Sequence, residues 1–188
     1  MDETTSIDGA GTLTNAPDGG YRVRFVRAYD RPVEDLWAAL TEPELLDSWY
    51  PTKLRTDGVV GNPVTETFES TDGTPPEPTP PGTLTAYEPP HVFEYRVHGP
   101  AEAEYPGMIG EQRIRMEAGP GGHDGESVLT FTHDIEKLEG ALDVLAGWHY
   151  CLEFLNLQMG APGEPTKENV ERYKAYYQRT YGSGRLDV

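Results

Sequence analysis

The sequence VRAYDRPVEDLWAALTEPELLDSW, residues 26–49, contains the change of hydrophobic period that decides the fold. Up to Tyr29, apolar and polar side chains alternate, as in a half-buried strand that we expect to start near Tyr21. Beyond Pro32, which suits the first turn of a helix, apolar side chains recur at helical spacing; they are Val33, Leu36, Trp37 and Leu40. The segment therefore predicts a strand that leads directly into a short amphipathic helix.

A second short helix is expected immediately after the first. Thr41 and Glu44 have the spacing of a capping box, in which two side chains satisfy backbone amides at a helix N-terminus. Pro51 would end this helix, because proline cannot continue the ladder of backbone hydrogen bonds.

The middle of the chain returns to a period of two and predicts five strands separated by Gly- and Pro-rich turns. The pairs or triplets that set their buried side are Val64 and Phe68, Leu84 and Ala86, Phe93 to Val97, Ile114 and Met116, and Leu129 to His133. The proline-rich run at 74–81 cannot join a central ladder, since proline lacks an amide donor. We expect an extended loop there, either a solvated connector or a lid over a binding site.

The last third of the chain is helical in pattern. Leu138 to Met159 carries an apolar stripe at helical spacing over about 30 Å. A second apolar stripe on the same helix needs its own cover, which a further helix within 166–181 can provide. Residues 1–20 contain few apolar side chains, so we expect a flexible arm or an edge strand.

Residues 21–182 show no repeat and no linker, and they predict a single α+β domain. In this domain a curved antiparallel sheet of about six to seven strands surrounds the long C-terminal helix. Two short helices follow the first strand, and an extra helix follows the long one.

This pattern resembles the SRPBCC superfamily of START-like and birch-pollen-allergen-like proteins, and residues 26–49 resemble its opening signature. Within it, Phe131-Thr132-His133 and Ala146-Gly147-Trp148-His149 resemble the branch of heat-shock-protein-90 ATPase activator homologues. The likeness covers about residues 21–182. It implies a helix-grip fold with an apolar cavity between sheet and long helix. Members of the superfamily include lipid and small-molecule binders, aromatase/cyclase enzymes and co-chaperone domains.

Composition excludes several classes of function. The 32 acidic and 15 basic residues give a net charge of −17, whereas nucleic-acid binding needs clustered cations. The single cysteine, Cys151, leaves no internal disulfide and fits a reducing cytoplasm. We expect no membrane span, because no apolar run reaches about 18 residues. The five histidines lack metal-ligand spacing, and the Gly-rich turn at 119–125 lacks the context of a phosphate loop, so neither a metal nor another cofactor is expected.

Seven residues are candidate ligand contacts, because strand parity or a central position on the long helix places them beside the expected cavity. They are Glu66, Tyr95, Phe131, His133, Trp148, His149 and Leu152. Core packing is the alternative interpretation of Tyr95 and His133, and a bulge in the strand would turn Glu66 outward. His133 in particular could be a buried histidine held by a backbone carbonyl or by Tyr95.

The leading functional hypothesis is non-catalytic binding of a small hydrophobic or aromatic molecule, with Tyr95, His133 and His149 orienting its polar end. The second hypothesis is an enzyme in which His133 or Glu66 promotes cyclisation, dehydration or hydrolysis of a polyketide-like substrate. The third, implied only by the resemblance, is an interaction module with a chaperone partner. Cys151 is not expected to be a nucleophile, because His149, two positions away, points to a different helix face and cannot act as its base.

Overall fold

The computed structural model describes residues 7–68, 80–99, 109–184 and 186. Apart from Pro80 and Pro81, the proline-rich run at 74–81, where we expect an extended loop, lies outside the described residues.

Strand β2 (Tyr21–Tyr29) leads into α1 (Val33–Thr41), which is followed by α2 (Pro43–Leu46), as the sequence predicts. The capping-box prediction is wrong, because Thr41 is the last residue of α1 and its hydroxyl donates to the Trp37 carbonyl (2.8 Å). Helix α2 starts instead with Pro43, whose fixed φ and missing amide suit a first helical position.

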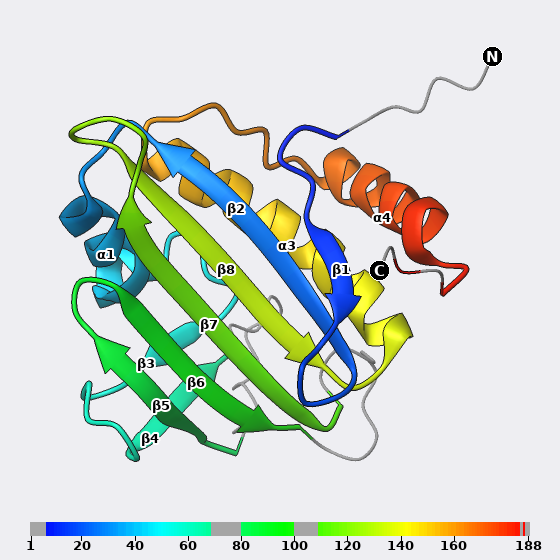
Figure 1. Cartoon of the computed structure of the whole chain (residues 1–188), viewed down its shortest axis with the longest axis horizontal. Coiled ribbons are helices and arrows are strands. Elements are labelled where there is room, and N and C mark those ends of the chain that lie inside the picture. Colours follow the sequence, from blue (N-terminus) through cyan, green and yellow to red (C-terminus); the bar gives the residue numbers. More distant parts are fainter. Residues whose placement is uncertain (1–6, 69–79, 100–108, 185, 187–188) are drawn as a thin grey trace.

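Within the described residues, the sheet has eight antiparallel strands in the order β1-β2-β8-β7-β6-β5-β4-β3 (Figure 1). The other strands are β1 (Thr12–Asn15), β3 (Lys53–Arg55), β4 (Pro63–Thr67), β5 (Gly82–Glu88), β6 (Val92–His98), β7 (Glu111–Pro120) and β8 (Ser127–Ile135). The predicted α+β helix-grip architecture is confirmed, but the strand count is higher than the expected six to seven. Strand β3 escaped prediction because three residues with one buried side chain, Leu54, form no recognisable alternation.

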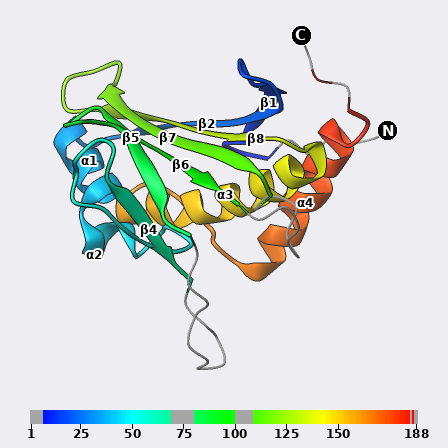
Figure 2. The same cartoon turned by 90° about the horizontal axis from the view of Figure 1, so that it is seen from below.

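Helix α3 (Leu138–Gln158) runs along the concave face of the sheet, and α4 (Lys167–Tyr181) packs against α3 (Figure 2). Both agree closely with their predicted ranges. Helices α1 and α2 close the end of the sheet opposite α4 (Figures 1 and 2). None of the helices in the described part of the chain combines the length and hydrophobicity needed to cross a bilayer.

The core between α3 and the sheet is packed most tightly along β2 and β8. Leu145, Leu152 and Leu155 of α3 are completely buried, as is Phe131 of β8. Farther along the sheet, toward β6, side chains of α3 and the strands leave space between them. This unfilled part of the grip holds the candidate site.

Candidate ligand-binding cavity

A cavity of about 420 Å³ lies between α3, the strands β6 to β8 and the segment that follows α2. Its apolar wall is formed mainly by side chains of the sheet and of α3; these include Val97, Ile114, Val144, Trp148 and Cys151. Phe68, which follows β4, is partly exposed at the same cavity.

One end of the cavity is polar and is built around Glu66 of β4. Tyr95 of β6 donates a hydrogen bond from its hydroxyl to Glu66 Oε1 (2.9 Å). The hydroxyl of Tyr50 forms a hydrogen bond with that of Tyr95, and Thr52 Oγ1 lies 3.4 Å from the same carboxylate oxygen. Because Tyr95 has one proton and gives it to Glu66, Tyr50 is the donor in the tyrosine pair. The three side chains thus form a directed chain that ends on the carboxylate.

Burial changes the protonation of this end. It raises the pKa of Glu66 above its ordinary value of 4.5, and the hydrogen bonds from Tyr95 and Thr52 offset only part of that rise. Burial also raises the pKa values of both tyrosines well above 10. The phenols therefore remain protonated near neutral pH, and the carboxyl is the group that titrates.

His133 lines another part of the cavity, but both of its ring nitrogens are occupied. Trp148 Nε1 donates to His133 Nδ1 at 2.9 Å. The neutral ring therefore carries its hydrogen on Nε2, which donates to Gln112 Oε1 at 3.0 Å. Burial lowers the pKa of His133 to about 3, so the ring stays neutral. The partners of His133 are thus the side chains of Trp148 and Gln112, and not the backbone carbonyl or Tyr95 that the sequence suggested.

His149 does not face the cavity, although its neighbour Trp148 does. Successive residues of a helix point about 100° apart, and His149 points toward α4. Its ring stacks on that of Tyr173 with centroids 3.9 Å apart, and its Nδ1 lies 2.8 Å from the Tyr177 hydroxyl. The expectation that His149 orients a ligand in this cavity is therefore corrected, because the side chain belongs to the α3–α4 interface.

Two further candidates lie behind the cavity wall. Phe131 packs against the Trp148 ring with centroids 4.4 Å apart and is fully buried. Leu152 is also fully buried and is not among the described lining residues. Of the seven candidates, the structure thus brings Glu66, Tyr95, His133 and Trp148 together at the cavity.

Sequence reasoning missed several lining residues. Gln112 could have been found, because it shares strand parity with Ile114. Cys151 could have been found from its position three residues after Trp148 on one helix face. Tyr50 and Thr52 carry no such signal, because they flank Pro51 in an irregular segment. Burial raises the pKa of the Cys151 thiol to about 12, so it stays protonated near neutral pH.

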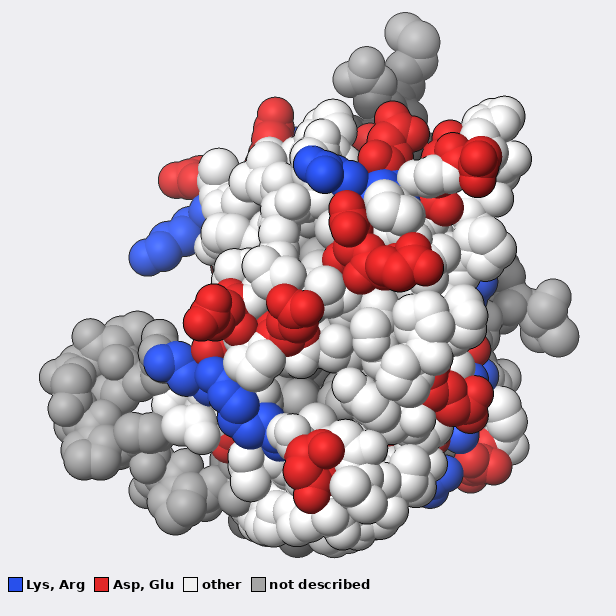
Figure 3. Space-filling view, turned by 90° about the vertical axis from the view of Figure 1, so that its left-hand side faces the viewer, with Lys and Arg blue, Asp and Glu red and all other residues white. Residues whose placement is uncertain are grey.

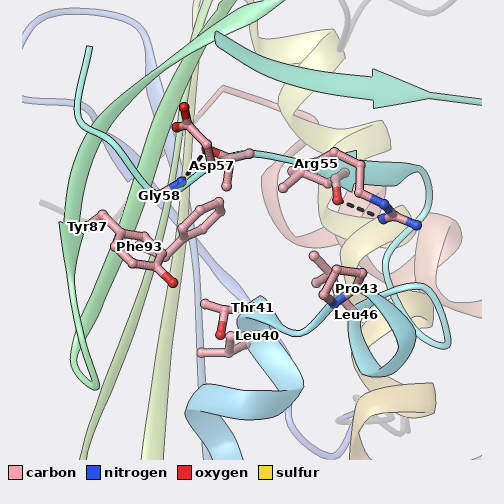
Figure 4. A pocket seen from close by; sticks show the side chains of 11 residues that line it. Leu40, Thr41, Pro43, Leu46, Arg55, Asp57, Gly58, Tyr87 and Phe93 are labelled. Atoms are coloured by element: carbon pink, nitrogen blue, oxygen red, sulfur yellow. Dashed lines mark hydrogen bonds between the residues drawn. The ribbon is translucent and has the colours of Figure 1, made fainter. Parts of the chain in front are cut away.

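A second hollow of about 220 Å³ lies between α1, α2, β3 and the sheet (Figure 4). Its charged groups already have partners. Arg55 forms two hydrogen bonds with Asp47 (2.7 and 2.6 Å), and Asp57 accepts from the Val59 amide and from Asn62. Of these two, the cavity of about 420 Å³ is the better candidate site, because it combines an apolar wall with polar groups. Among the described residues, no group of His, Cys, Asp and Glu is arranged to hold a metal ion.

Comparisons with known proteins agree with this architecture. Residues 20–149 match the family model described as polyketide cyclase/dehydrase and lipid transport. No curated protein matches the chain.

Solved structures of similar fold include CalU16 from Micromonospora echinospora, with 16% identity and a TM-score of 0.66 over 93% of this chain and 94% of that chain. The protein encoded by gene BPP1335 from Bordetella parapertussis has 18% identity and a TM-score of 0.64 over 97% of each chain. DynU16, a protein in the dynemicin biosynthetic locus, has 19% identity and a TM-score of 0.53 over 75% of this chain and 48% of its own. At these identities the likeness shows the fold alone.

Proposed function

This chain belongs to the polyketide cyclase/dehydrase and lipid transport family, and from that premise we propose that it binds a small, largely apolar molecule between α3 and the sheet. The cavity carries the proposal. Its volume of about 420 Å³ lies within the range of roughly 300–1,000 Å³ that is common for small-molecule sites. Apolar walls with a polar cluster around Glu66 also fit a ligand that is buried by its hydrocarbon part and oriented by one polar group.

Family membership confirms the SRPBCC resemblance at the level of the superfamily. The narrower branch of heat-shock-protein-90 ATPase activator homologues stays a prediction, and with it the chaperone partner and the cytoplasmic location. A purified chaperone whose ATPase rate does not change on addition of this protein would remove the interaction-module hypothesis.

Binding is favoured over catalysis by the state of two side chains. The neutral His133 has both nitrogens engaged, and the Cys151 thiol is protonated, so neither is a ready base or nucleophile near neutral pH. Burial of the ligand's apolar surface would supply most of the affinity, at about 25 cal/mol per Å².

A second candidate function is acid–base catalysis by Glu66. A partly buried carboxyl with a raised pKa and a hydrogen bond from Tyr95 is a suitable proton donor or acceptor. This hypothesis requires turnover of a polyketide-like substrate that is lost in Glu66→Gln while ligand binding persists. Turnover that survives this substitution would exclude Glu66 as the catalyst.

The binding proposal is tested with N-phenyl-1-naphthylamine, a neutral probe whose fluorescence rises in apolar surroundings. Gly147 of α3 lines the cavity, and a Cβ added there meets no atom within 4 Å. We expect saturable binding to the wild-type protein and a loss of at least about tenfold in affinity in Gly147→Leu, whose side chain occupies ligand space.

Gly147→Ala is the matched control, because it makes the same backbone change with little loss of volume, and it should bind the probe like the wild type. Absence of probe binding to the wild-type protein, or equal affinity in Gly147→Leu, would refute the proposal.

A further inference from the structure

The polar end of the cavity offers hydrogen-bond acceptors more readily than donors. Tyr95 gives its only hydroxyl proton to Glu66, and Tyr50 gives its own to Tyr95. An incoming ligand atom at this end therefore meets phenol lone pairs and a carboxyl group. A ligand that brings its own N–H or O–H is complementary to this arrangement, whereas one that brings only acceptors is not.

The remaining polar lining residues do not reverse this preference. The Nε2–H of His133 is used by Gln112 and its Nδ1 is used by Trp148, so the ring has no hydrogen left to donate. The Gln112 amide group remains a donor, but it carries no charge. Asp143 of α3 adds a second carboxylate to the lining. His98, at the exposed end of β6, has its Nδ1 atom 2.8 Å from Glu111 Oε1.

No lysine or arginine is among the described lining residues. Figure 3 shows groups of carboxylates on the side of the molecule that carries α1, in keeping with the net charge of −17. Both the local and the overall field therefore favour cations over anions.

From these observations, and resting on the proposed function, we infer that the cavity selects hydrophobic molecules that carry a protonated amine at one end and discriminates against those that carry a carboxylate. An ammonium group would donate charge-assisted hydrogen bonds to Glu66 and to the Tyr50 oxygen. A carboxylate would leave water beside another carboxyl group with no lysine or arginine from the described lining to neutralise it.

Three naphthalene compounds of nearly equal size separate this inference from binding as such. They are 1-naphthylmethylamine, 1-naphthalenemethanol and 1-naphthoic acid, which are a cation, a neutral donor and an anion at pH 7. Their affinities are measured by displacement of N-phenyl-1-naphthylamine. We expect the amine to bind at least about tenfold more tightly than the naphthoate, with the alcohol between them, since hydrogen bonds to charged groups are the stronger ones.

The Glu66→Gln substitution tests whether Glu66 causes the preference for the amine. The substitution keeps the shape of the side chain and removes the charge, so the advantage of the amine over the alcohol should fall by at least about threefold. Glu168→Gln is the matched control, because Glu168 is an exposed residue in the first turn of α4 and its loss changes the net charge equally. The control should keep the full preference.

The possible outcomes test separately the selectivity, its assignment to the cavity and the proposed function. Naphthoate binding as tightly as the amine overturns the selectivity, while binding of the alcohol and the neutral probe still supports the proposed function. An equal loss of preference in Glu66→Gln and Glu168→Gln would trace the effect to overall charge and overturn the assignment to the cavity. Failure of the neutral probe and all three compounds to bind would overturn the proposed function itself.

Discussion

The two sides of α3 meet the same kinds of side chain, phenols and titratable groups, but one side borders a cavity and the other is filled. On the cavity side, a hydrogen-bonded chain leads from Tyr50 through Tyr95 to the carboxyl group of Glu66, which lines the cavity. On the α4 side, the phenols of Tyr173 and Tyr177 close over the imidazole of His149. Aromatic and titratable side chains therefore do not by themselves identify a site, because the side of the helix that remains uncovered decides where a ligand can bind.

The α4 side is filled because two distant parts of the chain cover it. Helix α4 supplies Tyr173, whose ring stacks on His149, and the Gly11 amide donates to the Tyr177 hydroxyl (2.8 Å) from the opposite end of the sequence. A Cβ at Gly11 would lie 2.5 Å from the Phe25 ring, so the backbone approaches as closely as a glycine permits. At Gly147, on the cavity side, the same added atom meets nothing within 4 Å.

The largest expected effect comes from opening the packed side. Tyr177→Ala should lower the free energy of unfolding by about 3–5 kcal/mol, because it removes a completely buried aromatic ring. Val144→Ala, which removes two methyl groups at the cavity wall, should cost less than about 1 kcal/mol, since its side chain is only half-buried. Urea unfolding of both variants measures the difference. Similar losses would show that the two sides are packed alike.

The second effect is acid destabilisation by the two buried histidines. Burial lowers the pKa values of His133 and His149 to about 3, from 6.5 in the unfolded chain. Only the unfolded state gains these protons as the pH falls from 6.5 toward 3, so stability is complete above pH 6.5 and decreases below it. Each histidine contributes a slope of up to about 1.4 kcal/mol per pH unit in that window.

Replacing either histidine with asparagine should reduce this slope, measured by unfolding at several pH values between 4 and 6.5. The two variants differ in binding. His133→Asn should weaken binding of the neutral probe, because it removes the partner of Trp148 in the cavity wall. His149→Asn should leave probe binding unchanged, since its ring faces α4. A slope equal to that of the wild type in His149→Asn would mean that this histidine titrates normally in the folded protein.

The smallest expected effects are those of alanine substitutions at Gly147 and Gly11. Gly147→Ala should stabilise the protein by about 0.5–1 kcal/mol, because alanine favours a helix and the added methyl group enters open space. Gly11→Ala should instead destabilise it by about 1–3 kcal/mol through contact with the Phe25 ring. Thermal or urea unfolding provides the test. Equal signs for the two substitutions would contradict the difference in packing between the two sides of α3.

The fold was largely predictable because its signals are local. Residues 26–49 give β2, α1 and α2 through hydrophobic period, and residues 138–158 give α3 in the same way. The failures also have local causes. Strand β3 is too short to show a period, and the Thr41–Glu44 pair has capping-box spacing although the chain starts α2 at Pro43.

The candidate site was predictable only where one element fixes the direction of a side chain. Strand parity correctly placed Glu66, Tyr95 and His133 on the cavity side of the sheet. The same reasoning could not find Tyr50, which lies 45 residues from its partner Tyr95 in an irregular segment. It also could not tell that Trp148 faces the cavity and His149 faces α4, because both lie at the centre of a helix that is covered on more than one side.

The sequence by itself determined the order and type of most elements, the helix-grip architecture and the excess of negative charge, because hydrophobic period and composition act over a few residues at a time. Only the tertiary structure decided which side of α3 is filled by α4 and the Gly11 backbone and which side keeps a cavity of about 420 Å³. The physical reason is that empty volume and shared protons belong to no single segment. They arise where side chains from distant strands and helices meet, and in this protein that meeting brings Tyr50, Tyr95 and Glu66 together.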